Sequence, residues 1–321
     1  MKKIVVVQPV HSIGMGILQT GGQVVIPSGT SDQEIIAVAG DAEALVVRLT
    51  NVSASLIDAM PSLKVIGRNG VGVDNIDIGA ATKRRIAVIN TPGTNSNSVA
   101  EYVIAAFMAL HKKLVPLDRH VRNGEWHFRD HCRGVDLQEK TIGIIGMGQI
   151  GTILATKCKV GLGMNVLVYD PFMSAEYITS HGAMVAESMD ALLRVSDVVS
   201  LHIPLTQSTR NLFDGQTLRS MKRGAVLVNA SRGGIIDEQA LVQVLTEGHL
   251  SGAALDVFGE EPPVGDSLLW NAPNLLVTPH IAGLTEDAAA RTSEVMAKDV
   301  VAVLRGENPV NLYNEEILCE V

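Results

Sequence analysis

Polar side chains that can handle a proton and an acid group follow short apolar runs in the second half of the sequence. Arg232 comes just after the run that ends at Asn229 and before two glycines, so its guanidinium can hold a carboxylate at two points. His280 follows a Thr-Pro pair, and an imidazole can carry a proton near neutral pH. Glu261 precedes two prolines, and beside His280 its carboxylate would favour the imidazolium and orient the ring. With a redox cofactor to exchange hydride, this set is sufficient to interconvert a 2-hydroxy acid and a 2-oxo acid.

Each of these residues also has an ordinary structural explanation. Arg232 can form a surface salt bridge, Glu261 can belong to a solvated acidic loop, and a single histidine is more often structural. Asp256, upstream in the same acidic loop, can accept a hydrogen bond from a carboxamide N–H. All lie at strand ends, where open α/β sheets bind ligands, and the combination therefore favours the chemical interpretation.

A glycine pattern upstream predicts where the redox cofactor binds. Gly146, Gly148 and Gly151 are spaced G-x-G-x-x-G after the apolar run 142–145, and a helical stretch follows. In order, they permit a tight turn, let a pyrophosphate lie against the backbone and let the helix pack closely on the strand. Free N–H groups at the helix start attract the phosphates.

Asp170 ends the next apolar run, 19 residues after Gly151, and its carboxylate suits ribose hydroxyls and would repel a 2′-phosphate. The pattern favours NAD over NADP; the alternative is a glycine-rich turn without a ligand.

Alternating strand and helix patterns predict the elements that position these residues. We expect an α/β fold with two doubly wound parallel sheets, in which a Rossmann dinucleotide-binding domain (99–287) is inserted in a flavodoxin-like substrate domain (1–98 and 288–321). A strongly helical stretch at 286–304 would carry the chain back to the first domain. The expected strands are 3–7, 24–26, 44–47, 64–67, 87–89, 142–145, 166–169, 184–185, 198–201, 226–229, 253–257 and 275–277. The expected helices are 32–39, 53–60, 76–84, 98–114, 149–160, 189–195, 238–247 and 286–304.

Three further segments have weaker patterns. The loop 69–74 has two glycines, so its N–H groups can bind a small anion, unless it is an ordinary βα turn. Ser98 and Glu101 resemble a capping box that opens an apolar helix, which we expect to be buried between the domains. His127 and His131 are four residues apart in a polar surface crossover, 118–134. They have no acidic or cysteine partner at useful spacing, so we predict no metal site.

Composition narrows the classes of partner. The formal net charge is −8 (26 basic minus 34 acidic residues), which argues against nucleic acid and anionic membranes as partners. The longest apolar stretch, 103–110, is too short to span a bilayer. The three scattered cysteines, Cys132, Cys158 and Cys319, suit a reducing compartment without a disulfide framework. We therefore expect a cytoplasmic protein.

Over nearly its whole length the chain resembles the D-isomer-specific 2-hydroxyacid dehydrogenase family, most of all its D-3-phosphoglycerate dehydrogenase branch. The resemblance rests on seven motifs in order: GRNGVGVDNID at 67–77, NTPGTNSNS at 90–98, GMGQIG at 146–151, HIPLT at 202–206, NASRGG at 229–234, LDVF at 255–258 and TPHIAG at 278–283.

The resemblance implies roles for particular residues. Arg232, Glu261 and His280 would be catalytic, with His280 as the acid/base. The implied cofactor contacts are Gly146, Gly148, Gln149, Ile150, Gly151, Asp170, Pro204, Ala230, Arg232, Asp256, His280 and Gly283. The implied substrate contacts are Arg48, Val71, Gly72, Arg232 and His280. The resemblance also implies a homodimer built largely through the nucleotide domain.

The sequence departs from the family pattern in three places. Gln149 stands where many relatives have arginine, which removes a cationic contact to the pyrophosphate. Leu49 stands where the phosphoglycerate branch usually has serine, which removes a hydroxyl from the substrate mouth. The sequence stops without the C-terminal regulatory domain of long phosphoglycerate enzymes, so feedback by serine is not expected.

We therefore predict an NAD-dependent dehydrogenase of a small anionic D-2-hydroxy acid, in a cleft that closes on the substrate. A 3-phosphoglycerate-like substrate is the first choice, because Arg48 and Arg68 flank the substrate side. An internal ion pair of either arginine would remove this reason. Hydroxypyruvate or glyoxylate, sulfolactate and D-lactate are alternatives. The rival class is an NADH-sensing corepressor, which would need an exposed peptide groove on the first domain.

Overall fold

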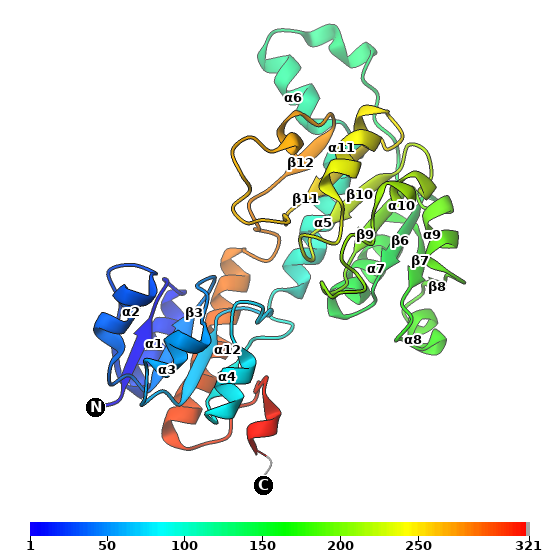
Figure 1. Ribbon diagram of the computed structural model, residues 1–321. Coiled ribbons are helices and arrows are strands. Elements are labelled where there is room, and N and C mark those ends of the chain that lie inside the picture. Colours follow the sequence, from blue (N-terminus) through cyan, green and yellow to red (C-terminus); the bar gives the residue numbers. More distant parts are fainter. Residues whose placement is uncertain (319–321) are drawn as a thin grey trace. The chain divides into compact units, whose positions relative to one another are not determined.

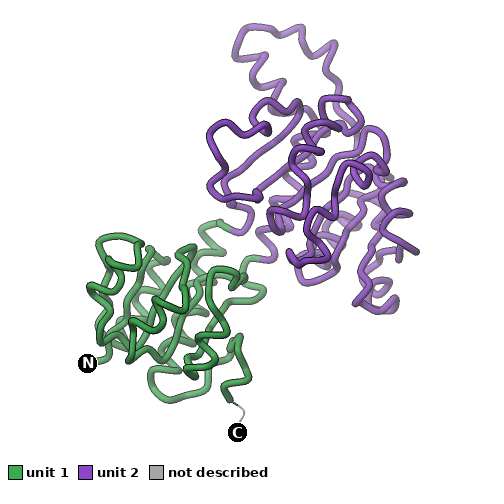
Figure 2. Tube along the Cα trace, in the orientation of Figure 1, with its two compact units in different colours: residues 1–95, 284–321 green, residues 96–283 purple. Residues whose placement is uncertain are grey.

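The computed structural model describes residues 1–318, which divide into two compact units (Figure 2). Unit 1 contains residues 1–95 and the chain from residue 284 onward, and unit 2 contains residues 96–283. The chain thus passes between units at 95/96 and 283/284, where the sequence analysis placed 98/99 and 287/288. Cys319 lies outside the described residues.

Unit 1 is built on a five-stranded parallel sheet in the order β2-β1-β3-β4-β5, the flavodoxin-like order expected from the sequence. Figure 1 labels its middle strand, β3, and the surrounding helices. Its strands are β1 (Lys3–Val6), β2 (Gln23–Val25), β3 (Ala44–Val47), β4 (Val65–Arg68) and β5 (Ala87–Ile89). Its helices are α1 (Ser12–Gly21), α2 (Asp32–Ala39), α3 (Ala54–Asp58), α4 (Ile78–Lys83), α12 (Glu286–Arg305) and the 3₁₀ turn η3 (Glu315–Leu318).

Apolar side chains alternate between the two faces of this sheet because successive residues of a strand point in opposite directions. Val5 packs with α2, α3 and α4 on one face, whereas Ile4 and Val6 pack with α1 and α12 on the other. The last helix therefore completes the core of unit 1. Thr285 caps its first turn, and Gly306, with a φ of 85°, ends it.

Unit 2 is built on a seven-stranded parallel sheet in the order β12-β11-β10-β9-β6-β7-β8, the Rossmann arrangement. Its strands are β6 (Thr141–Ile145), β7 (Asn165–Tyr169), β8 (Met184–Val185), β9 (Val198–Leu201), β10 (Val226–Asn229), β11 (Gly252–Leu255) and β12 (Leu275–Val277). Its helices are α5 (Ser96–His111), α6 (Leu114–Arg122), η1 (Trp126–Asp130), α7 (Gln149–Leu162), α8 (Ala175–Ser180), α9 (Met189–Val195), α10 (Gly215–Ser220), α11 (Glu238–Thr246) and η2 (Leu268–Asn271). The strand order reverses between β6 and β9, so this junction is the switch point at which such sheets bind ligands.

The start of helix α5 differs from the expectation. It begins at Ser96, and Ser98 is buried inside its first turn, so the predicted capping box is wrong. One face of α5 packs against α7, β10 and β11 of its own unit. Another face, with Ile104 and Met108, lines an open groove with Val160 and Leu162 of α7.

No helix within residues 1–318 combines the length and hydrophobicity needed to cross a bilayer.

Candidate functional site

The glycine loop follows β6 and lies against the end of β9. Gly146 has a φ of 93°, which favours glycine, and a Cβ there would lie 2.5 Å from the carbonyl oxygen of His202. A Cβ on Gly151 would lie 2.3 Å from the carbonyl oxygen of Gly146, so only glycine lets α7 approach the strand this closely. The backbone roles predicted for Gly146 and Gly151 are confirmed.

The N-terminus of α7 is open. Gly148 is its N-cap and supplies no side-chain acceptor, and a Cβ on Gly148 would meet no atom of residues 1–318 within 4 Å. The first-turn N–H groups, which include those of Gln149 and Ile150, point out of the helix with its positive dipole end. The side chain of Gln149 turns elsewhere: its carboxamide oxygen accepts a long hydrogen bond, 3.4 Å, from the Ser96 hydroxyl. This helix end has the polarity and the free space that a phosphate group needs.

Asp170 lies at the tip of β7 beside the glycine loop. Its Oδ2 accepts a hydrogen bond from the N–H of Met147 at 2.7 Å, and its Oδ1 accepts one from Phe172 at 2.9 Å. The carboxylate therefore has a fixed orientation, and each oxygen retains a lone pair for a hydroxyl donor. The cradle at Gly148, the uncapped helix and this carboxylate together fit a dinucleotide with a free ribose diol.

His280 and Glu261 form a hydrogen-bonded pair. The Nδ1 atom of His280 lies 2.7 Å from Oε2 of Glu261, and the two side chains are 44% and 35% exposed. The other carboxylate oxygen of Glu261 accepts the N–H of Phe258 at 3.0 Å. The carboxylate thus presents one oxygen to the imidazole, and the pair stays open to solvent.

The turn that carries His280 is held by Asp256, whose side chain is fully buried. Its Oδ1 accepts the Thr278 hydroxyl at 2.6 Å and the N–H of Ile281 at 2.8 Å, and its Oδ2 accepts the N–H of Ala282 at 2.7 Å. The N–H of His280 donates to the carbonyl oxygen of Asp256 at 2.9 Å, and His280 has a φ of 55°. Sequence reasoning offered Asp256 as an acceptor for a carboxamide and as a cofactor contact, and it missed this anchoring of the turn.

Helix α5 contributes to the same network. The hydroxyl of Tyr102 lies 2.6 Å from the Thr278 hydroxyl, whose proton goes to Asp256. Burial raises the pKa of Tyr102 to about 12, so its hydroxyl stays protonated and donates to Thr278 across the working pH range. No local signal in the sequence connects residue 102 to the histidine turn.

Arg232 lies on a tight loop after β10. Asn229 accepts the N–H of Ser231 and donates to the Arg232 carbonyl oxygen at 2.9 Å, which closes the turn. A Cβ on Gly233 would lie 1.7 Å from the carbonyl oxygen of Phe258, so two backbone segments touch there. Because Phe258 also donates to the carboxylate of the histidine pair, the arginine loop and that pair are fixed relative to each other.

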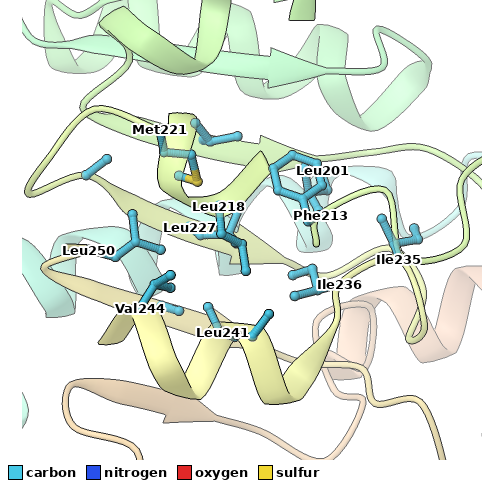
Figure 3. Packing of buried hydrophobic residues seen from close by; sticks show 14 of the residues in the cluster. Leu201, Phe213, Leu218, Met221, Leu227, Ile235, Ile236, Leu241, Val244 and Leu250 are labelled. Carbon is cyan, nitrogen blue, oxygen red and sulfur yellow. The ribbon is translucent and has the colours of Figure 1, made fainter. Parts of the chain in front are cut away.

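The far side of the arginine loop is anchored in the core. Ile235 and Ile236 are buried and pack in one cluster with Leu201, Phe213 and Leu227, beside α10 and α11 (Figure 3). Backbone bonds from Phe213 to Ile235 and from Asp237 to Phe213 reinforce the contact.

The remaining implied cofactor residues also follow strands of this sheet. Pro204 comes after β9 and is exposed, Ala230 comes after β10, and Gly283 ends unit 2. His202 lies at the switch point, where its Nε2 is 2.8 Å from the Ser200 hydroxyl. Burial lowers its pKa to about 4, so this imidazole is neutral at neutral pH.

Arg48, Val71 and Gly72 belong to unit 1, after β3 and β4, whereas Arg232, Glu261 and His280 belong to unit 2. Among residues 1–318, the Arg48 guanidinium approaches the Pro9 carbonyl oxygen at 3.5 Å and has no ion pair within 4.0 Å.

In unit 1, the Arg68 guanidinium donates to the carbonyl oxygen of Asn69 at 2.9 Å. The carbonyl oxygen of Val71 accepts a hydrogen bond from the Asn90 side chain at 2.8 Å.

No group of three or more His, Cys, Asp or Glu side chains within residues 1–318 is arranged to hold a metal ion. His127 is exposed, with Asp130 at 3.9 Å.

Comparisons with known proteins identify the family of this chain. The sequence model of the "D-isomer specific 2-hydroxyacid dehydrogenase, NAD binding domain" matches residues 104–282, which include the glycine loop and His280. The chain is 42% identical over 319 residues to a D-3-phosphoglycerate dehydrogenase of Archaeoglobus fulgidus, covering 98% of this chain and 60% of that protein. The chain therefore spans about 60% of that relative's length.

Other relatives match over most of both lengths. A glyoxylate reductase of Korarchaeum cryptofilum is 40% identical over 292 residues, covering 90% of this chain and 87% of that protein. The crystal structure of the TT0316 protein from Thermus thermophilus superposes with a TM-score of 0.87 at 33% identity, covering 97% of this chain and 99% of that one. With a family match across more than half of the sequence and relatives of this similarity, the chain belongs to the D-isomer specific 2-hydroxyacid dehydrogenase family.

Proposed function

We propose that the protein is an NAD-dependent oxidoreductase that interconverts a small D-2-hydroxy acid and its 2-oxo acid. The observation that carries the proposal is the His280–Glu261 pair, which lies on the sheet whose switch point bears the glycine loop. When bound, NAD supplies the chemistry of accepting hydride from carbon, and NADH that of returning it.

Side chains of unit 2 would transfer the proton, stabilise the charged imidazole and bind the substrate carboxylate. Nδ1 of His280 faces Glu261, so Nε2 is the atom that takes the hydroxyl proton in oxidation and returns it in reduction. Glu261 stabilises the imidazolium that forms in oxidation. Arg232 holds the substrate carboxylate with its guanidinium, which also polarises the adjacent carbonyl.

The Gly146–Gly151 loop, with the first-turn N–H groups of α7, would hold the cofactor's pyrophosphate, and Asp170 would hold its adenosine ribose. The proposed cofactor set is completed by Pro204, Ala230, Arg232, Asp256, His280 and Gly283.

We propose a small anionic substrate, with 3-phosphoglycerate first. Arg48, Val71 and Gly72 would contact it from unit 1, and support comes from an Arg48 guanidinium without an ion pair among the described residues. Leu49 is 66% exposed and apolar, which favours a smaller acid instead. Hydroxypyruvate or glyoxylate is therefore the first alternative, followed by sulfolactate and D-lactate.

A panel of 2-oxo acids tests both the reaction and the substrate. Each acid is mixed with NADH, and the loss of the reduced-nicotinamide absorbance near ~340 nm is followed. Steady turnover with at least one acid is expected, and kcat/KM ranks the acids. An NADH-sensing corepressor would instead bind NADH without turnover of any acid.

We also propose that the protein acts as a cytoplasmic homodimer joined through unit 2. Support comes from the groove between α5 and α7, which has a volume of about 690 Å³ and is lined by Ile104, Ala105, Met108 and Leu162. Val160 at its edge is 81% exposed, and a second copy that covers this surface would remove it from water.

A further inference from the structure

A three-residue loop after β3 is held from one side by a single side-chain oxygen. Oε1 of Gln8 accepts hydrogen bonds from the N–H groups of Arg48, Leu49 and Thr50 at 2.9, 2.8 and 3.2 Å. Three successive amides that converge on one oxygen form the concavity that loops otherwise use to bind an anion. Here the protein fills that concavity with its own carboxamide.

The same loop is held from the other side by Asn75. Its Nδ2 donates to the carbonyl oxygen of Thr50 at 2.6 Å and approaches that of Arg48 at 3.4 Å. Gln8 follows β1 and Asn75 follows β4, the two strands that flank β3. Both side-chain amides therefore reach the loop from neighbouring strands.

Hydrophobic packing contributes little to the shape of this loop at its centre. Leu49 is one of the most exposed large apolar residues of unit 1. The Arg48 guanidinium has only a long contact to the Pro9 carbonyl oxygen among residues 1–318. The position of the Arg48 side chain is thus set by the loop backbone. The side-chain amides of Gln8 and Asn75 hold that backbone in place.

We propose that Gln8 is a positioning residue for substrate binding, which acts by fixing the backbone of Arg48. The inference rests on the proposed function, in which Arg48 meets the anionic substrate. Because Gln8 holds the loop at three N–H groups, the backbone of Arg48 is already ordered before the substrate binds. Less conformational entropy is therefore lost on binding. Gln8 lies in unit 1 and the proton-transfer pair lies in unit 2, so its effect falls on KM for the acid and spares kcat.

The test compares four variants with the acid that turns over best. Gln8→Met keeps the length of the side chain but removes the acceptor, and Gln8→Glu keeps an acceptor for all three amides. Arg48→Met removes the guanidinium itself. Gln23→Met is the matched control, because Gln23 is an exposed glutamine of the same unit.

We expect Gln8→Met to raise KM for the acid about tenfold, with kcat and NADH affinity within about twofold of the parent. Gln8→Glu and Gln23→Met stay within about threefold of the parent KM. The double variant Gln8→Met/Arg48→Met matches Arg48→Met alone, because Gln8 acts through Arg48.

The outcomes separate this inference from the function on which it rests. A raised KM in Arg48→Met with an unchanged KM in Gln8→Met overturns the role of Gln8 and leaves substrate binding by Arg48 intact. An unchanged KM in Arg48→Met removes Arg48 from substrate binding and Gln8 with it. If Gln8→Met does not fold, Gln8→Asn shortens the side chain by one methylene and draws the acceptor away from the three amides, and an unchanged KM there overturns the inference.

Discussion

At the scale of single residues, the proposed chemistry depends on one proton carrier. We expect His280→Asn to lower kcat by roughly 10²- to 10⁴-fold, because the amide cannot exchange a proton with the substrate hydroxyl. NADH affinity should stay within about threefold, because the proposed phosphate and ribose contacts, which carry most of the cofactor binding, remain. The measurement is steady-state turnover beside NADH titration, with His127→Asn as a control because His127 is exposed. Unchanged turnover would remove His280 from the mechanism.

Asp170 tests the cofactor preference. Asp170→Ala removes the carboxylate that would repel a 2′-phosphate, so the apparent KM for NAD should rise while use of NADP improves. The ratio of kcat/KM for the two cofactors reports the change. A ratio equal to that of the parent would show that the carboxylate does not set the preference.

His202 predicts a pH dependence of stability. Its folded-state pKa of about 4 lies below the ordinary value of 6.5, so above pH 6.5 both states are neutral and the favourable burial is fully present. As pH falls from 6.5 towards 4, the unfolded chain binds the proton and the folded chain does not. About 2–3 kcal/mol is therefore lost over this window.

The check is urea denaturation of the parent and of His202→Gln, whose amide can still reach Ser200. The difference in unfolding free energy between the two should shrink as pH falls from 7 to 4.5. A difference that stays constant over this range would contradict the assignment.

At the scale of elements, the start of α7 has two glycines with different roles. Gly148 leaves room for a ligand, whereas Gly151 lets the helix pack closely on its strand. Gly148→Ala adds a Cβ that meets no atom of residues 1–318 within 4 Å, so the fold should be unchanged while the methyl group occupies the proposed pyrophosphate position. NADH affinity should fall at least about tenfold with Tm unchanged.

Gly151→Ala is the counterpart within the same helix. Its Cβ would lie 2.3 Å from the Gly146 carbonyl oxygen, so helix and strand must separate and Tm should fall together with binding. Thermal unfolding and NADH titration of both variants make the test. Equal losses of Tm in the two variants would contradict the distinction.

At the scale of the whole molecule, the proposed homodimer places an apolar surface of unit 2 against a second copy. Val160→Glu puts a charge on the groove edge, where burial against apolar side chains would be unfavourable. Light scattering should give a dimer for the parent and a monomer for the variant. Glu187→Gln is the control, because Glu187 is exposed in the same unit. A parent that is monomeric at all concentrations would end the proposal.

The sequence by itself determined most of the architecture, and it placed the proposed chemistry at strand ends of the second sheet. Apolar runs, helical periodicity and glycine spacing are local signals, since strand burial and the steric need for glycine act within a few residues. The strands β3, β5, β9, β10 and β12 have the bounds that their patterns predicted. The parallel order of both sheets followed from the alternation of strand and helix.

Tertiary structure alone decided the contacts between residues that are distant in the chain. Helix α1 was not predicted, because its three glycines resemble a loop, yet a Cβ on Gly14 would lie 2.7 Å from Ser293 of α12. The anchoring of the histidine turn by Asp256 and Tyr102, and the three amides on Gln8, join segments that only the order of the strands brings side by side. Such contacts leave no local pattern, because the residues near one partner in the sequence do not indicate which distant residue it will contact.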